Sequence, residues 1–311
     1  MTHWLVTGAN GNLGRRLIGK LLQDDTDTTV TALVRSTRAQ QTILDVVQPP
    51  SFSAEQQARL RVVVVDYEDT AGIASAAAQC ERAVHLVGIL KATRAASYEQ
   101  AHQRSCAALV QALPDTHISH VTYMSIVGSS ASASNACLRS KGEAEDILCQ
   151  AQQECCVLRV PMVLGEGDYA SFALRKRALS RFSFGFRNNS LEQPIYAGDV
   201  VDAIVQAGTG SVDACLDLAG PEVLTRAALT RRAAQVLQRT TTPLSLPIGL
   251  GLLFAGILEK LTANPPVTRA MLEVLDHDDE VDPQAAVTAL QLAGLTPLDE
   301  MLQAVLTDAH R

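Results

Sequence analysis

A glycine pattern near the N-terminus constrains the fold of this 311-residue chain more than any other feature. The apolar run at residues 4–6 predicts a buried strand. Three glycines follow at the spacing Gly-x-x-Gly-x-x-Gly, and leucines at 13, 17, 21 and 22 then recur with helical spacing. A strand, a glycine turn and a helix in this order are typical of a site that holds a dinucleotide pyrophosphate at the positive end of a helix.

Each glycine has a physical role in such a turn. Gly8 allows the chain to turn tightly, Gly11 lets backbone N–H groups approach phosphates, and Gly14 lets the helix lie close to the sheet. The alternative is a glycine-rich turn that binds no ligand, but the strand before it and the helix after it favour a nucleotide. We expect cofactor contacts in this turn from Thr7, Gly8, Asn10, Gly11, Asn12, Leu13 and Gly14.

Composition and charge exclude several classes of protein. An apolar content of 47% with only 4% aromatic residues indicates an aliphatic core, as in parallel sheets covered by helices. The net charge of −7 argues against general nucleic-acid binding. The seven cysteines include no Cys-x-x-Cys pair and no histidine stands at ligand spacing, so we expect a reducing cytoplasm, no disulfide framework and no metal site. We also expect neither a signal peptide nor a membrane span.

Further apolar segments alternate with helical or polar stretches along the first half of the chain. This alternation predicts an α/β fold with a doubly wound parallel sheet, the Rossmann arrangement. We expect the dinucleotide-binding core over residues 1–165 and a small, mostly helical C-terminal lobe over 166–311, with 193–220 returning to the core. The further strands are expected at 28–34, 62–65, 83–87, 120–124 and 157–160.

The end of the second predicted strand selects between the two nicotinamide cofactors. An acidic residue there would accept the ribose hydroxyls of NAD, whereas an arginine favours the 2′-phosphate of NADP. Arg35 stands at this point, Arg38 follows soon after, and neither Asp nor Glu lies there. NADP(H) is therefore the preferred cofactor and NAD(H) the second choice; the alternative is that these arginines are simply solvated.

Other strand ends complete the predicted cofactor site. Asp66 follows the third strand, where it could bond the adenine edge or cap the helix expected at 73–78. Gly88, after the fourth strand, again permits close backbone approach. Further contacts with the cofactor are expected from Val87, Ser125, Lys141 and Pro161.

These features together resemble the short-chain dehydrogenase/reductase superfamily. The resemblance rests on the glycine loop, Asp66, Ser125, Lys141 and the Arg-Val-Pro turn at 159–161, and it covers residues 3 to about 240. In detail the chain is similar to the atypical, extended branch, with the nucleotide-binding accessory subunit of respiratory complex I and NmrA-like proteins as relatives. The resemblance implies a Rossmann fold, a nicotinamide dinucleotide and, often, a homodimer.

The resemblance also implies a reaction centre, from which one residue is missing. Reductases of this superfamily use a Tyr-x-x-x-Lys pair, in which the lysine holds the nicotinamide ribose and lowers the pKa of the tyrosine. Four residues before Lys141 stands Cys137, whose thiol is a weaker donor with a shorter reach than a phenol. We therefore expect the usual proton relay to be absent, with Ser125, Lys141 and the degenerate position Cys137 as the catalytic candidates.

Two questions about this centre stay open from the sequence. Cys137 is either a small packing residue, which we favour, or a reactive thiol whose pKa is lowered by the helix dipole and Lys141. Three tyrosines could substitute for the missing one, namely Tyr123, Tyr169 and Tyr196. Tyr123 is expected to be packing, and Tyr169 is the one that could reach the cleft.

Two stretches of the C-terminal third could meet a partner. In residues 172–187, four phenylalanines alternate with five Lys and Arg residues. Three interpretations of this stretch remain open: the wall of a substrate pocket, a solvated basic helix, and a patch that touches anionic lipid. Residues 247–261 form the most apolar window; a buried helix is the first choice, and an interfacial helix touching a membrane or a quinone tail the second. Asp199 is expected to cap a helix, and 276–280 to form a solvated acidic turn.

An intact nucleotide loop beside a missing tyrosine favours a protein that binds NADP(H) in a redox-sensing, structural or respiratory and quinone-associated role. One alternative is an NADPH-dependent oxidoreductase or epimerase acting on a quinone, a ketone or a sugar-nucleotide-like substrate. Another is an NmrA-like regulator that binds a protein partner. We expect the protein in the cytoplasm, with peripheral contact at the inner membrane as a further option.

Overall fold

A seven-stranded parallel sheet forms the centre of the computed structural model, which describes residues 2–48, 50–93, 96–262, 268–274 and 278–307. The strand order is β11-β6-β5-β4-β1-β2-β3, and every pair in this sheet is parallel. The strands are β1 (Thr2–Thr7), β2 (Thr28–Val34), β3 (Leu60–Val64), β4 (Arg82–His85), β5 (His120–Ile126), β6 (Glu154–Val160) and β11 (Ala214–Asp217). This order confirms the predicted doubly wound α/β fold.

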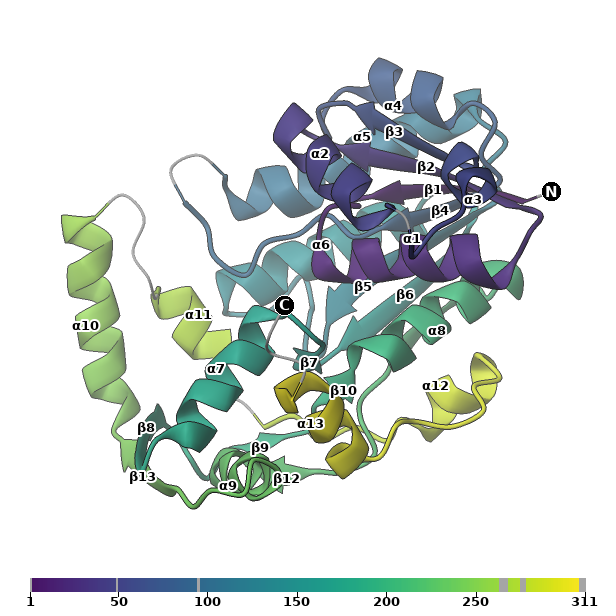
Figure 1. The fold of residues 1–311 in the computed structure, drawn as a ribbon. Helices are drawn as coiled ribbons and strands as arrows, with labels where there is room; N and C mark the ends of the chain where they lie inside the picture. The colour runs from purple at the N-terminus through teal and green to yellow at the C-terminus, as the bar shows by residue number, and fades with distance from the viewer. Residues whose placement is uncertain (1, 49, 94–95, 263–267, 275–277, 308–311) are drawn as a thin grey trace.

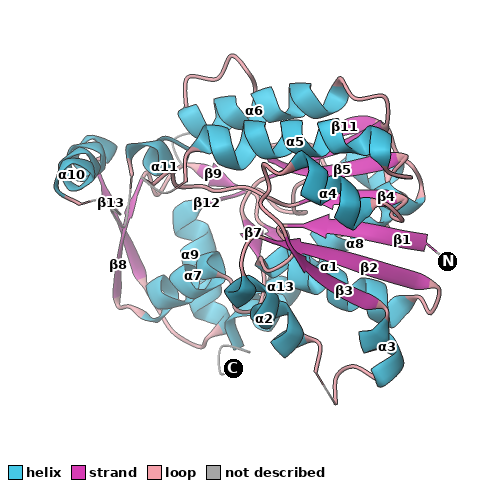
Figure 2. Ribbon diagram, turned by 90° about the horizontal axis from the view of Figure 1, so that it is seen from above, coloured by secondary structure: helices cyan, strands magenta, loops and turns pink. Residues whose placement is uncertain are grey.

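Helices cover both faces of the sheet (Figure 2). One face carries α1 (Asn12–Asp24), α2 (Thr37–Val46) and α8 (Ala197–Thr209), and the other carries α4 (Thr70–Ala77), α5 (Ser105–Ala112) and α6 (Ala136–Cys149). Successive strand residues alternate between the two cores, so Leu5 and Val6 pack on opposite faces. Cys155 and Cys156 do the same, so both are small core residues.

Several local features differ from expectation. The predicted buried strand at 62–65 is β3, whose Val64 is 40% exposed because β3 is an edge strand. The seventh strand, β11, was not predicted, since its residues are only partly buried. A short helix, α3 (Ala54–Ala58), precedes β3. Three consecutive helical segments follow β4, namely the π-helix η1 (Glu99–Arg104), α5 and the 3-10 helix η2 (Leu113–Asp115).

The C-terminal lobe mixes helices with three short strand pairs. Its own hydrophobic core lies between α7 (Tyr169–Leu179), α9 (Arg226–Val236) and α13 (Leu298–Thr307). The strand pairs are β7 (Val163–Leu164) with β10 (Ile195–Tyr196), β9 (Leu191–Glu192) with β12 (Leu224–Thr225), and β8 (Phe182–Phe186) with β13 (Thr242–Leu246). The remaining helices are α10 (Ile248–Leu261), α11 (Arg269–Val274) and α12 (Gln284–Ala289).

The structure shows what the acidic residues of two predicted features contact, namely Asp199 and the acidic run at 276–280. Asp199 does not cap α8: Tyr196 is the N-cap, and the Asp199 carboxylate instead accepts bonds of 2.8 and 2.7 Å from the backbone N–H and hydroxyl of Thr296. In the acidic run, 276 and 277 lie outside the described residues, while Asp278 accepts a 2.8 Å bond from the backbone of Leu191.

Within the described ranges, none of the helices has both the length and the apolar character needed to cross a membrane. The same residues contain no cluster of three or more His, Cys, Asp and Glu side chains that could hold a metal ion.

Candidate functional site: a pocket at the carboxyl edge of the sheet

A pocket of about 360 Å³ opens where β1, β2, β3 and β4 end. It lies at the carboxyl edge of the parallel sheet, the place where open α/β sheets bind their ligands. Among the predicted cofactor residues, those that line it are Gly8, Asn10, Gly11, Arg35, Asp66, Val87 and Gly88. The other predicted cofactor and catalytic residues lie outside the lining, namely Thr7, Asn12, Leu13, Gly14, Arg38, Ser125, Cys137, Lys141 and Pro161.

The glycine turn forms one wall of this pocket. Gly8 has a φ of +66°, and a Cβ there would stand 2.9 Å from the carbonyl of Leu86. A Cβ on Gly14 would stand 2.5 Å from the carbonyl oxygen of Ala9, so only glycine lets α1 begin this close to the turn. Gly11 is the N-cap of α1 without a side-chain cap, and the first turn holds no acidic residue. The positive end of α1 is therefore suited to an anion.

A tyrosine that the sequence analysis did not single out completes this wall. The backbone N–H of Gly8 donates a 3.2 Å bond to the Tyr67 hydroxyl, which donates a 3.3 Å bond to the carbonyl of Leu33. Burial raises the pKa of Tyr67, so its phenol stays protonated. Tyr67 thus joins the ends of β1 and β2; its position one residue after Asp66 was the sole signal in the sequence.

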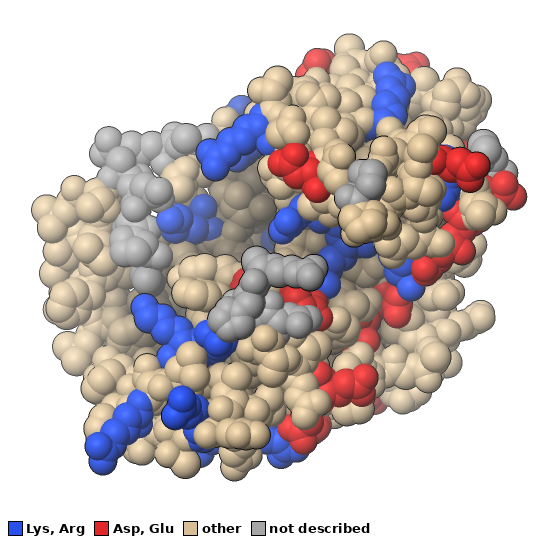
Figure 3. All heavy atoms as spheres, in the orientation of Figure 1, with Lys and Arg blue, Asp and Glu red and all other residues tan. Residues whose placement is uncertain are grey.

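The charged residues that line the pocket are Arg35, Asp66 and Glu68. Asp66 is exposed, and its carboxylate accepts a 2.9 Å bond from the backbone of Glu68. The cap of α4 is Asp69, so the predicted capping alternative for Asp66 is wrong. Arg38 is exposed in the first turn of α2. Figure 3 shows a hollow in this face of the molecule, with Lys and Arg side chains around its margin.

The start of α1 is also tied to the loop after β7. The Asn12 amide donates a 3.2 Å bond to the carbonyl of Glu166, and Arg16 forms a 2.5 Å ion pair with its carboxylate. The Tyr196 hydroxyl donates to the same carboxylate at 2.7 Å. Asn12 therefore positions the glycine turn, and Tyr196 is engaged away from the pocket.

Lys141 lies directly behind the pocket wall. Its ammonium group donates a 2.7 Å bond to the carbonyl of Met124 and stands 4.5 Å from the ring centroid of Tyr123. A Cβ on Gly88 would be 3.0 Å from its Nζ atom, so a glycine is all that separates Lys141 from the pocket. Burial lowers the pKa of Lys141 to about 8.

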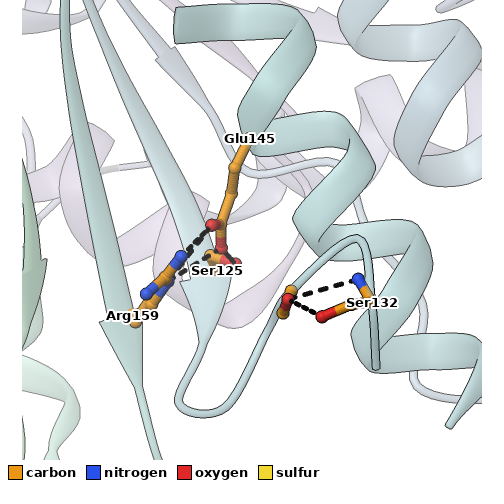
Figure 4. A network of polar contacts seen from close by, with 5 residues as sticks. Ser125, Ser132, Glu145 and Arg159 are labelled. Atoms are coloured by element: carbon orange, nitrogen blue, oxygen red, sulfur yellow. Dashed lines mark hydrogen bonds and ion pairs between the residues drawn. The ribbon is translucent and has the colours of Figure 1, made fainter. Parts of the chain in front are cut away.

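Ser125 is engaged by an internal ion pair (Figure 4). Its hydroxyl donates to the carboxylate of Glu145, one turn beyond Lys141 on α6. Glu145 also accepts bonds from Arg159, 3.1 Å from Nε and 2.5 Å from a terminal nitrogen, and Arg159 stands opposite Ser125 in the β5–β6 register. The Ser125 hydroxyl is therefore held by the protein itself.

Cys137 is fully buried at the start of α6. Its thiol lies 3.7 Å from the carbonyl of Ile89, and burial raises its pKa to about 11. This direction contradicts a thiol activated by a lowered pKa and supports the packing interpretation. Of the substitute tyrosines, Tyr123 is buried as expected, and Tyr169 is 81% exposed at the start of α7.

Two buried histidines support the pocket, and the sequence analysis missed both. His102, in the π-helix η1, accepts a 3.1 Å bond from the backbone of Ile89 through Nε2, so Nδ1 carries the hydrogen shared with Ser140 at 2.7 Å. Nδ1 of His85 and the hydroxyl of Thr7 share a 2.8 Å hydrogen bond. Burial lowers the pKa of each histidine to about 3, so both are neutral. Thr7 is thus a bonding partner inside the sheet.

Comparisons with known proteins agree with this geometry. A model of an NAD(P)H-binding family matches residues 8–176. The solved structure of UDP-glucuronic acid 4-epimerase from Bacillus cereus, in complex with NAD, is similar with 15% identity and a TM-score of 0.71, over 99% of this chain and 96% of that one. A nucleoside-diphosphate-sugar epimerase from Staphylococcus aureus has 12% identity and a TM-score of 0.72, over 97% and 100%.

A third similar structure is UDP-N-acetylglucosamine 4-epimerase from Bacillus cereus, with 15% identity and a TM-score of 0.72 over the full length of both chains. At identities this low the likeness shows the fold. A search of curated proteins finds no match to the sequence.

Proposed function

We propose that this chain, which belongs to the NAD(P)H-binding family whose model it matches, is an atypical member of the extended short-chain dehydrogenase superfamily that binds NADP(H) and has a degenerate reaction centre. Its role would be redox-sensing, structural, or associated with a respiratory or quinone-linked partner. The observation that carries the proposal is that the pocket is formed while the Ser125 hydroxyl and the Cys137 thiol of the reaction centre are held by other groups of the protein.

The pocket fits the phosphate and adenosine part of the cofactor. Gly11 leaves free the space that a Cβ would fill, and the uncapped start of α1 offers N–H groups to a phosphate. In the proposed complex Arg35 faces the 2′-phosphate and Asp66 the adenine edge, because both line the pocket and follow the paired strands β2 and β3. Arg38 adds positive charge nearby.

The reaction centre supports binding better than chemistry. A bound NADPH supplies a hydride, and an active reductase must then supply a proton. Cys137 is buried with its thiol protonated, and the Ser125 hydroxyl already donates to Glu145. Lys141 remains the group nearest the pocket, separated from it by Gly88. We assign Lys141 to the cofactor side of the site, where it would hold the ribose.

The first alternative is an NADPH-dependent oxidoreductase or epimerase. Sugar-nucleotide epimerases among the similar structures favour it, with a quinone, ketone or sugar-nucleotide-like substrate. The second is an NmrA-like regulator, which would require a protein partner whose affinity differs between NADP and NADPH. A homodimer is compatible with all three.

The test of cofactor binding is a fluorescence titration with NADPH and NADH, using wild-type protein and Arg35→Ala. We expect NADPH to bind more tightly than NADH, and the variant to lose about tenfold in NADPH affinity while its NADH affinity changes little. Arg61→Ala, an exposed arginine on β3 outside the lining, is the matched control. Equal binding of both nucleotides by wild-type protein would reject the NADP preference.

The test of chemistry follows NADPH absorbance with quinones, ketones and sugar nucleotides added in turn. We expect tight binding without oxidation. Oxidation that depends on an added substrate and disappears in Lys141→Ala would overturn the degenerate reaction centre and establish the enzyme alternative instead.

A further inference from the structure

Helix α10 presents its large apolar side chains to solvent. The predicted buried helix in this window is wrong, because five large side chains, at positions i, i+3, i+4, i+7 and i+11, are between 46% and 75% exposed. They form one outward stripe, made of Leu250, Leu253, Phe254, Ile257 and Leu261. This arrangement is the reverse of a helix on an ordinary globular protein, which turns such a stripe toward the core.

The opposite side of α10 is made of small residues and packs on the lobe. A Cβ on Gly251 would stand 2.8 Å from the ring of Phe186, and Ala255 is buried. The guanidinium of Arg269 lies near Gly256, and the backbone N–H of Arg269 donates a 2.7 Å bond to the carboxylate of Glu259. The contacts of this small-residue side therefore fix the helix with its apolar stripe outward.

The exposed apolar surface continues at the base of α10 onto the β8–β13 pair. Phe184 and Leu244 are cross-strand partners and both are exposed, as is Phe182. We call the stripe and these three residues the apolar edge of the lobe. Figure 3, in the orientation of Figure 1, shows neither Lys and Arg nor Asp and Glu on this face of the outer margin where α10 lies, whereas Lys and Arg side chains lie below it, toward β8 and β13.

The two chain segments that include the apolar edge and its flanking residues are basic in an otherwise acidic chain. Residues 169–187 and 239–262 hold seven of the 26 Lys and Arg residues but one of the 33 Asp and Glu residues. Lys176, Arg181 and Arg239 are exposed. The Arg181 guanidinium lies 5.6 Å from the ring centroid of Phe182, so cation and aromatic face solvent together. Exposed apolar and basic groups side by side match the chemistry of an anionic lipid surface.

We propose that the apolar edge of the lobe lies on a membrane that contains anionic lipid. In this arrangement the stripe of α10 enters the headgroup and acyl boundary, while Lys176, Arg181 and Arg239 meet the lipid phosphates. The helix lies in the membrane plane, because its 14 residues extend about 21 Å and a hydrocarbon core measures about 30 Å.

A second copy of the chain fits this surface less well. A symmetric pairing would bring the basic residues of one copy against the same residues of the other, and such juxtaposition of like charges opposes association. A membrane with anionic headgroups instead supplies the opposite charge. It also needs no complementary groove for a helix that stands at the outer margin of the lobe (Figure 1).

The experiment is co-sedimentation of the full chain with vesicles. Phosphatidylcholine vesicles are compared with vesicles of phosphatidylcholine and phosphatidylglycerol in about a three-to-one ratio. We expect binding to the anionic vesicles that falls with added salt. The triple variant Leu253→Ser, Phe254→Ser, Ile257→Ser should weaken it by about tenfold or more, since each removed apolar side chain contributes to insertion.

The matched control is Leu44→Ser with Val46→Ser, two exposed apolar residues of α2 on the far part of the molecule, which should bind like wild-type protein. Replacing Lys176, Arg181 and Arg239 by Gln should cost about fivefold per residue on anionic vesicles. Circular dichroism confirms that each variant is folded.

Three results would overturn the proposal. They are no binding to anionic vesicles, binding that the serine triple variant leaves unchanged, and self-association in ultracentrifugation that the same triple variant abolishes. The last result would assign the edge to a second copy. None of these readouts involves NADP(H), so the failure of this inference is distinguishable from the failure of the proposed cofactor function.

Discussion

The hydroxyl of Ser125 donates its hydrogen to the carboxylate of Glu145, one helical turn beyond Lys141 on α6. Glu145 is in turn held from the side by the guanidinium of Arg159, which raises the pKa of Arg159 further. A strand-end serine that could have met a substrate carbonyl therefore belongs to an internal network that joins β5, α6 and β6. The polar residues of the candidate reaction centre therefore also contribute to the stability of the fold.

Replacing Glu145 should test that link. Glu145→Ala would leave the Arg159 guanidinium and the Ser125 hydroxyl without their shared acceptor, and we expect the free energy of unfolding to fall by about 3 kcal/mol, the lower end for a buried pair because Arg159 is partly exposed. Urea unfolding measures the loss. The control is Asp299→Ala, which breaks the exposed pair with Arg232 and should cost less than about 1 kcal/mol. Equal losses in the two variants would contradict the network.

Thiol reactivity should separate the cysteines into two groups. Cys149 and Cys215 are exposed, whereas the other five are buried, and burial raises the pKa of both Cys137 and Cys215 to about 11, so access to solvent rather than thiol pKa separates the two groups. With a thiol reagent at pH 8 we expect two thiols to react in the native protein and the other five to react only after denaturation. In Cys149→Ser with Cys215→Ser the fast phase should disappear. A fast phase that persists in this variant and is lost in Cys137→Ser would show that Cys137 is reactive.

The sheet and the glycine turn were predictable because their signals are local. Apolar strands of four to seven residues alternated with helices, and only glycine tolerates the positive φ of Gly8 or the close approach of Gly14 to Ala9. β11 escaped prediction because its residues alternate between partial burial and exposure, unlike the buried central strands.

The hydrogen-bond partners of the polar site residues could not be predicted from the sequence. That Ser125 meets Glu145 depends on the register of β5 with β6 and on the rotation of α6, which arise only when distant segments pack. Tyr67 reaches Gly8 across the ends of two strands for the same reason. The orientation of α10 could not be predicted either, because an apolar stripe at helical spacing gives the same sequence pattern whether it faces a core or solvent.

Gly14 and Gly11 of the glycine turn should respond differently to replacement by alanine. Gly14→Ala forces a Cβ to within 2.5 Å of the Ala9 carbonyl oxygen, so we expect a melting temperature several degrees lower and loss of NADPH binding. Gly11→Ala meets only the carbonyl oxygen of Gly8, at 3.2 Å, so its melting temperature should stay near that of wild-type protein while NADPH affinity falls about tenfold. Thermal melting and fluorescence titration measure the two effects. A Gly11→Ala protein that binds NADPH normally would place the phosphates elsewhere.

Stability should fall as the pH drops below about 6.5. His85 and His102 are buried, and burial lowers the pKa of each to about 3, so the folded protein keeps both neutral in mild acid. An unfolded chain protonates its histidines near pH 6.5. Between these two values the unfolded state binds more protons, and the free energy of unfolding therefore decreases as pH falls, by up to about 4 kcal/mol between pH 6.5 and 5 for the pair.

Urea unfolding at a series of pH values measures this slope. In His102→Gln the slope should be clearly smaller than that of wild-type protein but more than half of it, since His85 and the buried His120, whose pKa burial also lowers, still titrate. His117→Gln, at an exposed histidine, should keep the wild-type slope and serves as the control. If His102→Gln retained the full slope, the acid sensitivity would come from other groups, and His102 would have to be protonated in the folded protein, in conflict with the hydrogen bond that its Nε2 atom accepts from Ile89.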